Sequence, residues 1–375
     1  MDSESNVEEE QENFEMGDDI PYNSGNDQDL SQLVIDTVKP VVILLWNKMF
    51  VGIPGDLLVG KQSFTACKNL PCSLTIDKAY ESSADAIIMP WSERVMFSDV
   101  PNRVKQDQII VFEAMEGPLI NARPADRVFD KYRGIFNWTM TYRDDADVKK
   151  SYGEFHFYDI GERPPLGGIR NLVENKTKVA AWFVANTATA FDRFNYVKEL
   201  QKYIQIDIYG PNQKLKCPTS LWGECLEMVD LNYKFYLSFE NTFAKDYITE
   251  KMFSHIGRPV VPVVLGGANY KKLFPPHSYI DSSYFKSPKD LAKYLLLLDK
   301  NTNLYMEYFE WIRRGIFKFH QPQWCNLCIK LLTRKQGETK YYNDIYKWYY
   351  DQKYWFKKFT KVPSRFEIDN AFNYN

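Results

Sequence analysis

Short apolar runs alternate with polar and amphipathic segments from residue 41 onward. Eight of these runs have the length and composition of buried strands. They are residues 41–46, 84–89, 108–113, 135–141, 178–185, 206–209, 235–239 and 259–264. After residue 185, apolar positions at helical spacing run from Phe191 to Ile204 and predict an amphipathic helix. Strands that alternate with helices predict an α/β fold with two open, mostly parallel sheets.

The chain divides at a Pro- and Gly-rich stretch, residues 161–168, which reads as a linker. We therefore expect an amino-terminal domain over 31–165, a carboxy-terminal domain over 166–330 and a helical extension over 331–375. In that extension, Tyr342, Ile345 and either Trp348 or Tyr349 share one side of a predicted packing helix. Lysines among its aromatic residues are compatible with nucleic-acid stacking, but packing is the better interpretation.

Charge is distributed unevenly. Residues 1–30 hold eleven Asp or Glu and no Lys or Arg, and this acidic composition predicts a disordered segment. Since the whole chain carries a net charge of −2, the rest carries +9. That mildly basic body suits an anionic substrate and is too weak to indicate nucleic acid. No run reaches the ~18 apolar residues that span a bilayer, and no signal peptide is visible.

Six cysteines lie in three close pairs, and their even number favours disulfides. Fifteen pairings are open. The Cys325-x-x-Cys328 spacing also permits a zinc or a redox site, but no second pair has matching spacing and no clear βαβ context surrounds it. The sequons at Asn137 and Asn175 are compatible with a secretory route.

The stretch from residue 235 to 264 is the most informative. It reads as strand, polar loop, short helix and strand, with Thr249 as the helix N-cap and Gly257 as its stop. Glu250 and Lys251 then lie in the first helical turn. A carboxylate and an ammonium there could divide one nucleotide between ribose hydroxyls and diphosphate. An ordinary crossover with a solvated first turn would give the same pattern.

This stretch, FENTFAKDYITEK followed by VPVV, resembles the signature of the α1,3-fucosyltransferases of glycosyltransferase family 10. Residues 137–147 and 178–200 resemble further family elements. The resemblance implies a GT-B fold, two Rossmann-like domains facing a cleft, behind an acidic stem. It implies inverting transfer of L-fucose from GDP-β-L-fucose to the 3-hydroxyl of a GlcNAc in an N-glycan core or N-acetyllactosamine. Another GT-B nucleotide-sugar transferase, or a catalytically silent sugar-binding protein, remains an alternative.

The resemblance also implies a location. Family members are type II proteins of the Golgi lumen, with a membrane anchor that this chain lacks; we expect a trimmed form. The expected partners are GDP-fucose and a glycan or glycoprotein acceptor, without nucleic acid.

For catalysis, Glu113 is the expected base because it closes a predicted strand, and Glu116 is the alternative. The expected donor-binding residues are Arg193 and Lys251 for the diphosphate, Glu250 for the ribose, and Asn241 and Tyr247 in the pocket. No essential metal is expected, although Asp145 and Asp147 match a D-x-D pattern. Asp144 stands where the family has an arginine.

Overall fold

The computed structural model describes a defined part of the chain. The described residues are 39–46, 64, 67, 70–91, 99–118, 126–158, 165–187, 189, 192–319, 324–335, 337, 340–350 and 363–372. The expected acidic stem, residues 1–30, and most of the Pro- and Gly-rich linker lie outside these residues. Pro40–Asn375 form one compact unit.

Six parallel strands form the first sheet, in the order β2-β1-β3-β4-β5-β6. The strands are β1 (Val41–Leu45), β2 (Cys72–Thr75), β3 (Ala86–Pro90), β4 (Ile109–Ala114), β5 (Trp138–Thr141) and β6 (Val148–Lys149). The four strands expected from this half are confirmed. The sequence did not reveal β2, which alternates buried and half-buried residues and so shows no apolar run, or β6, which has only two residues.

Alternate residues of β4 enter two apolar layers on opposite faces of the first sheet. Ile109 and Val111 pack with α9 (Cys325–Thr333), whereas Ile110 and Phe112 pack with α10 (Ile345–Tyr350). A 3₁₀ helix, η6 (Asp126–Tyr132), joins the α10 layer. The packing role expected for the helix near residue 345 is confirmed. The division at residue 330 stays a prediction, but α9 runs across it and packs on the first sheet.

Five parallel strands form the second sheet, in the order β12-β11-β10-β8-β9. They are β8 (Lys178–Phe183), β9 (Ile206–Tyr209), β10 (Tyr233–Phe239), β11 (Val261–Leu265) and β12 (Ile280–Asp281). Strand β10 begins two residues before its predicted start, and β11 begins two residues after its own. The prediction of a second parallel sheet is confirmed.

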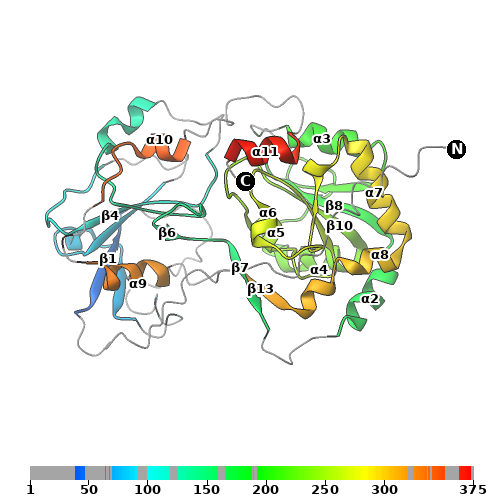
Figure 1. Cartoon of the computed structure of the whole chain (residues 1–375), viewed down its shortest axis with the longest axis horizontal. Coiled ribbons are helices and arrows are strands. Elements are labelled where there is room, and N and C mark those ends of the chain that lie inside the picture. The colour runs from blue at the N-terminus through cyan, green and yellow to red at the C-terminus, as the bar shows by residue number, and fades with distance from the viewer. Residues whose placement is uncertain are drawn as a thin grey trace. The chain divides into compact units, whose positions relative to one another are not determined.

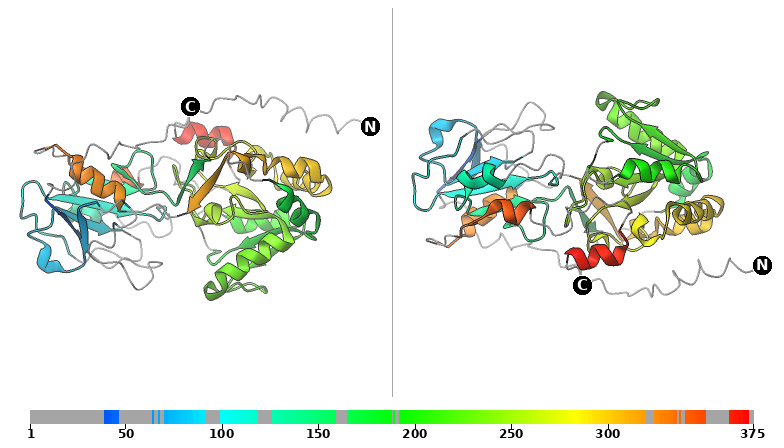
Figure 2. Two further views of the ribbon diagram at one scale, coloured as in Figure 1. Left: turned by 90° about the horizontal axis from the view of Figure 1, so that it is seen from below. Right: turned by 90° about the horizontal axis from the view of Figure 1, so that it is seen from above.

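Helices cover both faces of the second sheet (Figures 1 and 2). One layer contains α3 (Arg193–Leu200), α7 (Pro288–Lys300), α8 (Thr302–Glu307) and part of α11 (Arg365–Phe372). The opposite layer contains α4 (Trp222–Asn232). Two sheets, each covered by helices on both faces, therefore make up the α/β fold expected from the sequence.

Shorter elements complete the described chain. They are η4 (Lys78–Tyr80), α2 (Gly167–Glu174), η7 (Thr219–Leu221), α5 (Glu250–Phe253), α6 (Tyr270–Leu273), η8 (Ser282–Tyr284) and η9 (Glu310–Arg313). Strands β7 (Gly153–Phe157) and β13 (Gly315–Phe319) pair antiparallel to each other.

All six cysteines form disulfides, which confirms the disulfide interpretation. Two bonds, Cys67–Cys325 and Cys72–Cys328, attach α9 to the first sheet, and the third joins Cys217 to Cys225. The C-x-x-C pair is therefore split between two long-range bonds.

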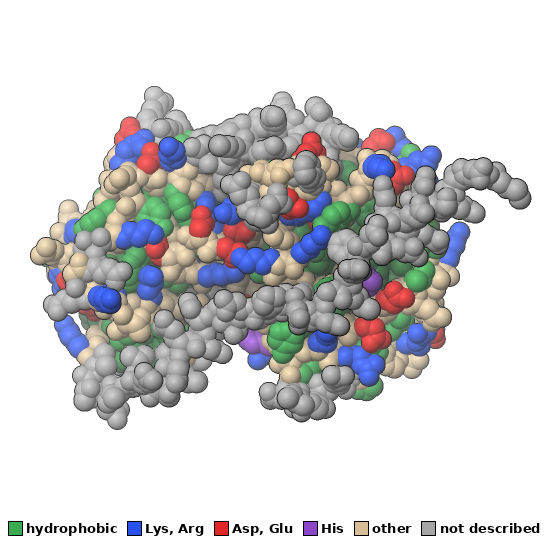
Figure 3. Space-filling view, in the orientation of Figure 1, with side chains coloured by type: hydrophobic (Ala, Val, Ile, Leu, Met, Phe, Trp, Pro, Cys, Tyr) green, Lys and Arg blue, Asp and Glu red, His purple; other side chains and the backbone are tan. Residues whose placement is uncertain are grey.

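Charged residues of both signs are interspersed on the face drawn in Figure 3. The described helices include none with the length and apolar character that crossing a bilayer requires.

Candidate active site

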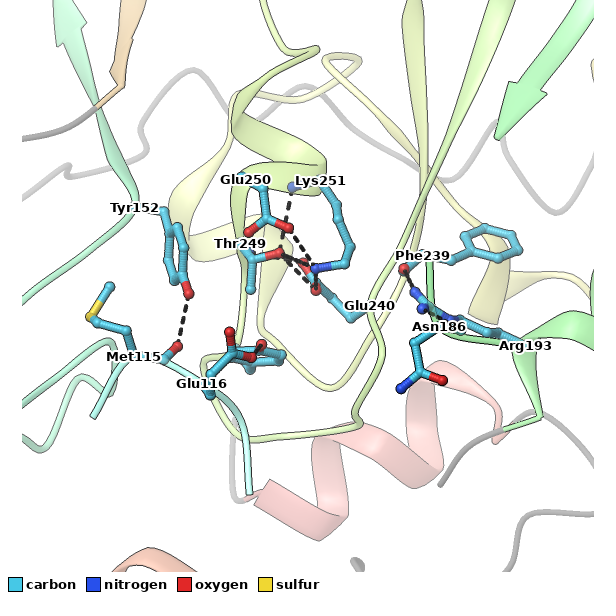
Figure 4. A network of polar contacts seen from close by, with 11 residues as sticks. Met115, Glu116, Tyr152, Asn186, Arg193, Phe239, Glu240, Thr249, Glu250 and Lys251 are labelled. Carbon is cyan, nitrogen blue, oxygen red and sulfur yellow. Dashed lines mark hydrogen bonds and ion pairs between the residues drawn. The ribbon is translucent and has the colours of Figure 1, made fainter. Parts of the chain in front are cut away.

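The strand order of the second sheet reverses between β8 and β10, because β9 lies beyond β8 while β11 and β12 extend the sheet from β10. Ligands of open α/β sheets bind at such a switch point, outside the carboxyl ends of the strands. Arg193 lies there. Its guanidinium donates to the carbonyls of Phe239, the last residue of β10, and Asn186, which follows β8 (Figure 4). The fold therefore places a buried cation at the switch point.

Arg193 opens α3, whose N-cap Asp192 accepts from the backbone N–H of Asn195. The Arg193 side chain is buried, and burial lowers its pKa while the nearby carboxylate of Glu240 opposes that shift. Among the described residues it forms no ion pair, and its Nε has no hydrogen-bond partner. A buried guanidinium held by neutral carbonyls keeps its charge available to an anion.

Helix α5 begins as the sequence predicts. Thr249 caps it by accepting from the backbone N–H of Lys251, so Glu250 and Lys251 form its first turn. The helix ends at Phe253, three residues before the expected end. The following turn closes at Gly257, whose φ of +81° suits glycine.

Lys251 is the centre of a polar network (Figure 4). Its Nζ lies 2.9 Å from Glu250 Oε1, 3.3 Å from Glu240 Oε2 and 2.8 Å from Thr249 Oγ1. Glu240 is 1% exposed and also accepts from the backbone N–H of Thr249. Two carboxylates and a hydroxyl thus fix the ammonium beside the switch point.

Burial and ion pairing compete in this network. Burial lowers the pKa of Lys251, but the carboxylates of Glu240 and Glu250 outweigh it and the net shift is upward. Burial also opposes ionisation of Glu250, yet Lys251 holds that pKa below its usual value. Glu240 differs, because burial raises its pKa despite Lys251. Lys251 and Glu250 therefore stay charged at neutral pH.

Tyr247 and Asn241, the two other predicted pocket residues, lie in the same loop. Tyr247 is buried, and burial together with the charges of Glu116, Glu240 and Glu250 raises its pKa. Asn241 is partly buried, and its Oδ1 has no hydrogen-bond partner in the part of the chain that the structure describes. An amide oxygen left unpaired at this point suits contact with a ligand.

Glu113, the expected base, is not part of this network. Strand β4 continues to Ala114, so Glu113 lies inside the strand rather than at its end. Its carboxylate is 2% exposed and lies 2.5 Å from Lys150 Nζ, which is itself buried. The Glu113 carboxylate is thus enclosed with a cation inside the first sheet rather than exposed at its edge.

Glu116, the alternative, occupies the loop that follows β4 and is exposed. Its Oε2 accepts from the Tyr247 hydroxyl at 3.2 Å, which links it to the signature loop. The next residue, Gly117, permits this approach, because a Cβ there would lie 3.0 Å from the Tyr247 ring. The structure therefore brings Glu116 to the loop that follows β10, whereas Glu113 is paired with Lys150 (Figure 4 shows Glu116).

The acidic run after β5 is already bonded to basic and hydroxyl groups. Asp145 pairs with Arg143, with Oδ2 2.6 Å from Nη2. Asp147 accepts from Thr139 and Tyr342 and pairs with Lys340. Arg143 and Asp147 therefore bond to separate partners.

Asp144, at the family's arginine position, pairs with Lys149 and Lys272. Its backbone N–H also donates to Asp246, in the signature loop. The aspartate that replaces the family's arginine is thus neutralised by two lysines.

Two residues of the network escaped the sequence analysis. Glu240 follows the buried strand β10 directly, and that position was a usable signal. Tyr152 follows the two-residue strand β6, which no pattern revealed. Its hydroxyl donates to the carbonyl of Met115 at 2.8 Å.

Two helix-covered parallel sheets, with cations held at the switch point of the second, define the architecture of a GT-B glycosyltransferase. A solved α1,3-fucosyltransferase structure, described as containing GDP-fucose, shares this fold with a TM-score of 0.53 at 15% identity. The match covers 80% of this chain and 93% of that one.

The sequence matches the model "Fucosyltransferase, N-terminal" over residues 38–153. It matches "Glycosyltransferase family 10 (fucosyltransferase) C-term" over residues 173–348. The chain belongs to glycosyltransferase family 10, the fucosyltransferases.

Two curated relatives come from Drosophila melanogaster. Alpha-(1,3)-fucosyltransferase C is 34% identical over 82% of this chain and 77% of its own length. Glycoprotein 3-alpha-L-fucosyltransferase A is 35% identical over 83% of this chain, which spans 60% of that protein's length.

Proposed function

We propose that this protein transfers L-fucose from GDP-β-L-fucose to the 3-hydroxyl of a GlcNAc residue in a glycan, with inversion at the fucose carbon. The observation that carries the proposal is the grouping of charges around Tyr247: it donates to Glu116 and lies within electrostatic range of Arg193 and Glu250, and Glu250 pairs with Lys251. Family membership and the named activities of the relatives support the same chemistry.

The donor binds at the switch point of the second sheet. Arg193 and Lys251 hold the diphosphate, and the half-exposed carboxylate of Glu250 accepts from the ribose hydroxyls. Asn241 and Tyr247 complete the pocket. As the bond between the fucose carbon and the phosphate oxygen breaks, negative charge grows on GDP, and the two fixed cations stabilise it.

Glu116 takes the proton from the acceptor hydroxyl while that oxygen forms its bond to fucose. This revises the expected assignment of Glu113, because a base must reach the proton it removes. Glu116 is exposed and accepts from Tyr247 through one oxygen, and no described residue bonds to the other, which is left for an acceptor. The Glu113–Lys150 pair instead stabilises the first sheet.

No metal is needed in this scheme, because Arg193 and Lys251 supply the positive charge. The carboxylates of Asp145 and Asp147 are bonded to Arg143, Lys340 and Tyr342. Transfer at full rate in EDTA supports this, and loss of activity restored by Mn²⁺ contradicts it.

We propose the Golgi lumen as the site of action and a glycoprotein or free glycan as the acceptor. Three disulfides support an oxidising compartment. Localisation of the tagged protein in a eukaryotic cell tests this, and retention in the cytosol contradicts it.

The central test is transfer from GDP-fucose to defined N-glycans and N-acetyllactosamine, with product linkage read by NMR. We expect α1,3-linked product from the wild type. Glu116→Gln should bind GDP-fucose normally and lower kcat about 10²–10⁴-fold, the usual contribution of a general base. Donor binding without turnover in the wild type would favour a silent binding protein, and preference for another nucleotide sugar would favour a different transferase.

A further inference from the structure

The backbone on both sides of Glu116 is held by two tyrosine hydroxyls from distant segments. Tyr152 donates to the carbonyl of Met115 at 2.8 Å, and Tyr349 donates to the carbonyl of Glu116 itself (Figure 4 shows the first contact). Tyr152 follows β6, whereas Tyr349 lies in α10, 233 residues beyond Glu116 in the chain. Two consecutive peptide units are therefore fixed on either side of one exposed acid.

Fixing these two peptides determines the direction of the Cα–Cβ bond of Glu116. The Tyr247 hydroxyl then orients the carboxylate. An exposed loop residue without such bonds would sample many positions, and a displacement of about 1 Å at a catalytic group can cost about 100-fold in rate.

Tyr349 is anchored well enough to impose this position. It is 2% exposed, and its ring packs on Phe112 of β4 with the centroids 5.3 Å apart. The preceding residue, Trp348, accepts from Arg143 through its carbonyl and stacks under the guanidinium at 4.1 Å. These contacts fix helix α10 to β4 and to Arg143. Tyr349 itself is too buried to touch a substrate.

We infer that Tyr349 is a positioning residue for the transfer reaction: helix α10, through the Tyr349 hydroxyl, sets the place of the Glu116 carboxylate, and Tyr152 supports the same loop from the other side. This inference rests on the proposed role of Glu116. The family match ends at residue 348, one residue before Tyr349. Helix α10 would therefore serve the reaction as well as the core.

The test compares Tyr349→Phe with Tyr350→Phe, which removes a buried hydroxyl from the same helix. The Tyr350 hydroxyl accepts from Trp91 Nε1 at 3.0 Å. We expect Tyr349→Phe to lower kcat about 5–20-fold with an unchanged Kd for GDP-fucose, since the base moves while the donor site stays intact. Both variants lose one hydrogen bond of a buried tyrosine, so we expect them to lower Tm by similar amounts. Tyr350→Phe should nevertheless leave kcat within about twofold of the wild type.

A double-mutant cycle gives the decisive readout. If Tyr349 acts through Glu116, adding Tyr349→Phe to Glu116→Gln should reduce residual transfer by less than about twofold. An equal loss in both backgrounds, or a kcat loss shared by Tyr350→Phe, would assign Tyr349 a structural role and overturn the inference.

Tyr152→Phe tests the loop independently should Tyr349→Phe fold poorly. A wild-type kcat in Tyr152→Phe also counts against the inference. Wild-type turnover by Glu116→Gln alone would instead refute the proposed function.

Discussion

The buried charged residues associated with the two sheets have different kinds of partner. In the second sheet, Arg193 is held by two neutral carbonyls and keeps its charge available for a ligand. In the first sheet, Glu113 is equally buried, but Lys150 neutralises it at 2.5 Å. Burial of an ionisable group is therefore a poor guide to its role, and the partner that holds it is a better one.

The position of an acidic residue relative to the end of its strand also distinguishes Glu113 from Glu116 and Glu240. Glu240 and Glu116 both lie past the last residue of a parallel strand, where side chains reach the ligand-binding edge. Glu113 lies one residue before such an end and faces the sheet core. A shift of three residues along the chain thus separates an acid paired inside the first sheet from one that contacts Tyr247.

The largest effect is expected at the Glu113–Lys150 pair. Glu113→Gln leaves a buried ammonium without its counter-ion and should lower the free energy of unfolding by about 3–5 kcal/mol. The paired replacement Glu113→Leu with Lys150→Met should recover most of that loss, as measured by urea unfolding. Turnover per folded molecule should stay within about threefold of the wild type. A fall of 100-fold or more would return the catalytic role to Glu113.

The next effect is expected at the switch point of the second sheet. Arg193→Met and Lys251→Met should each lower kcat/KM about 10²–10³-fold and weaken GDP binding, because each removes a fixed cation from the diphosphate. Arg258→Met is the matched control, since Arg258 is paired with Asp230. Calorimetric titration with GDP measures the binding. An unchanged Kd in Arg193→Met would remove this residue from the site.

A smaller, pH-dependent effect is expected at His255. Its ring is fully buried, stacks on Tyr236 and has no hydrogen-bond partner among the described residues. Burial, with Arg258 nearby, holds its pKa well below 6.5. Below pH 6.5 the unfolded chain binds a proton that the native state does not, so stability falls with pH.

His255 alone should lower the free energy of unfolding by about 1.4 kcal/mol when the pH falls from 7.5 to 5.5, given a pKa of about 6.5 for histidine in the unfolded chain. Thermal unfolding at the two pH values measures it. His255→Phe should remove this part of the pH dependence, whereas the exposed control His277→Asn should retain it. An identical pH dependence in His255→Phe would contradict the assignment.

The smallest effect is expected at the two sequons. Asn137 is fully buried, and its amide bonds to Arg103, Ile110 and Lys340. Asn175 is exposed at the end of α2. In a secretory host we expect a glycan at Asn175 only. Asn175→Gln should abolish the gel shift produced by N-glycanase, and a remaining shift would point to Asn137.

The sequence located the residues that we assign to the donor because their signals are local. Thr249, Glu250 and Lys251 share one helical turn, and Arg193 opens the helix after a clear strand. The assignment of the base to Glu113 stays a prediction, and we propose Glu116 in its place because the end of β4 could not be located to one residue from the sequence. Tyr349 was predicted only as a packing residue, and Lys150 was not predicted at all. Their partners lie 233 and 37 residues away, and only the packing of separate elements joins them.

The two disulfides that attach α9 to the first sheet have a topological consequence. Every strand of the second sheet lies between Cys72 and Cys325 in the chain, so the covalent framework encloses that whole layer in one closed ring. A single protease cut within the ring would leave both pieces covalently joined until a reductant opened it. Opening it would also give the unfolded chain greater conformational freedom, which favours unfolding.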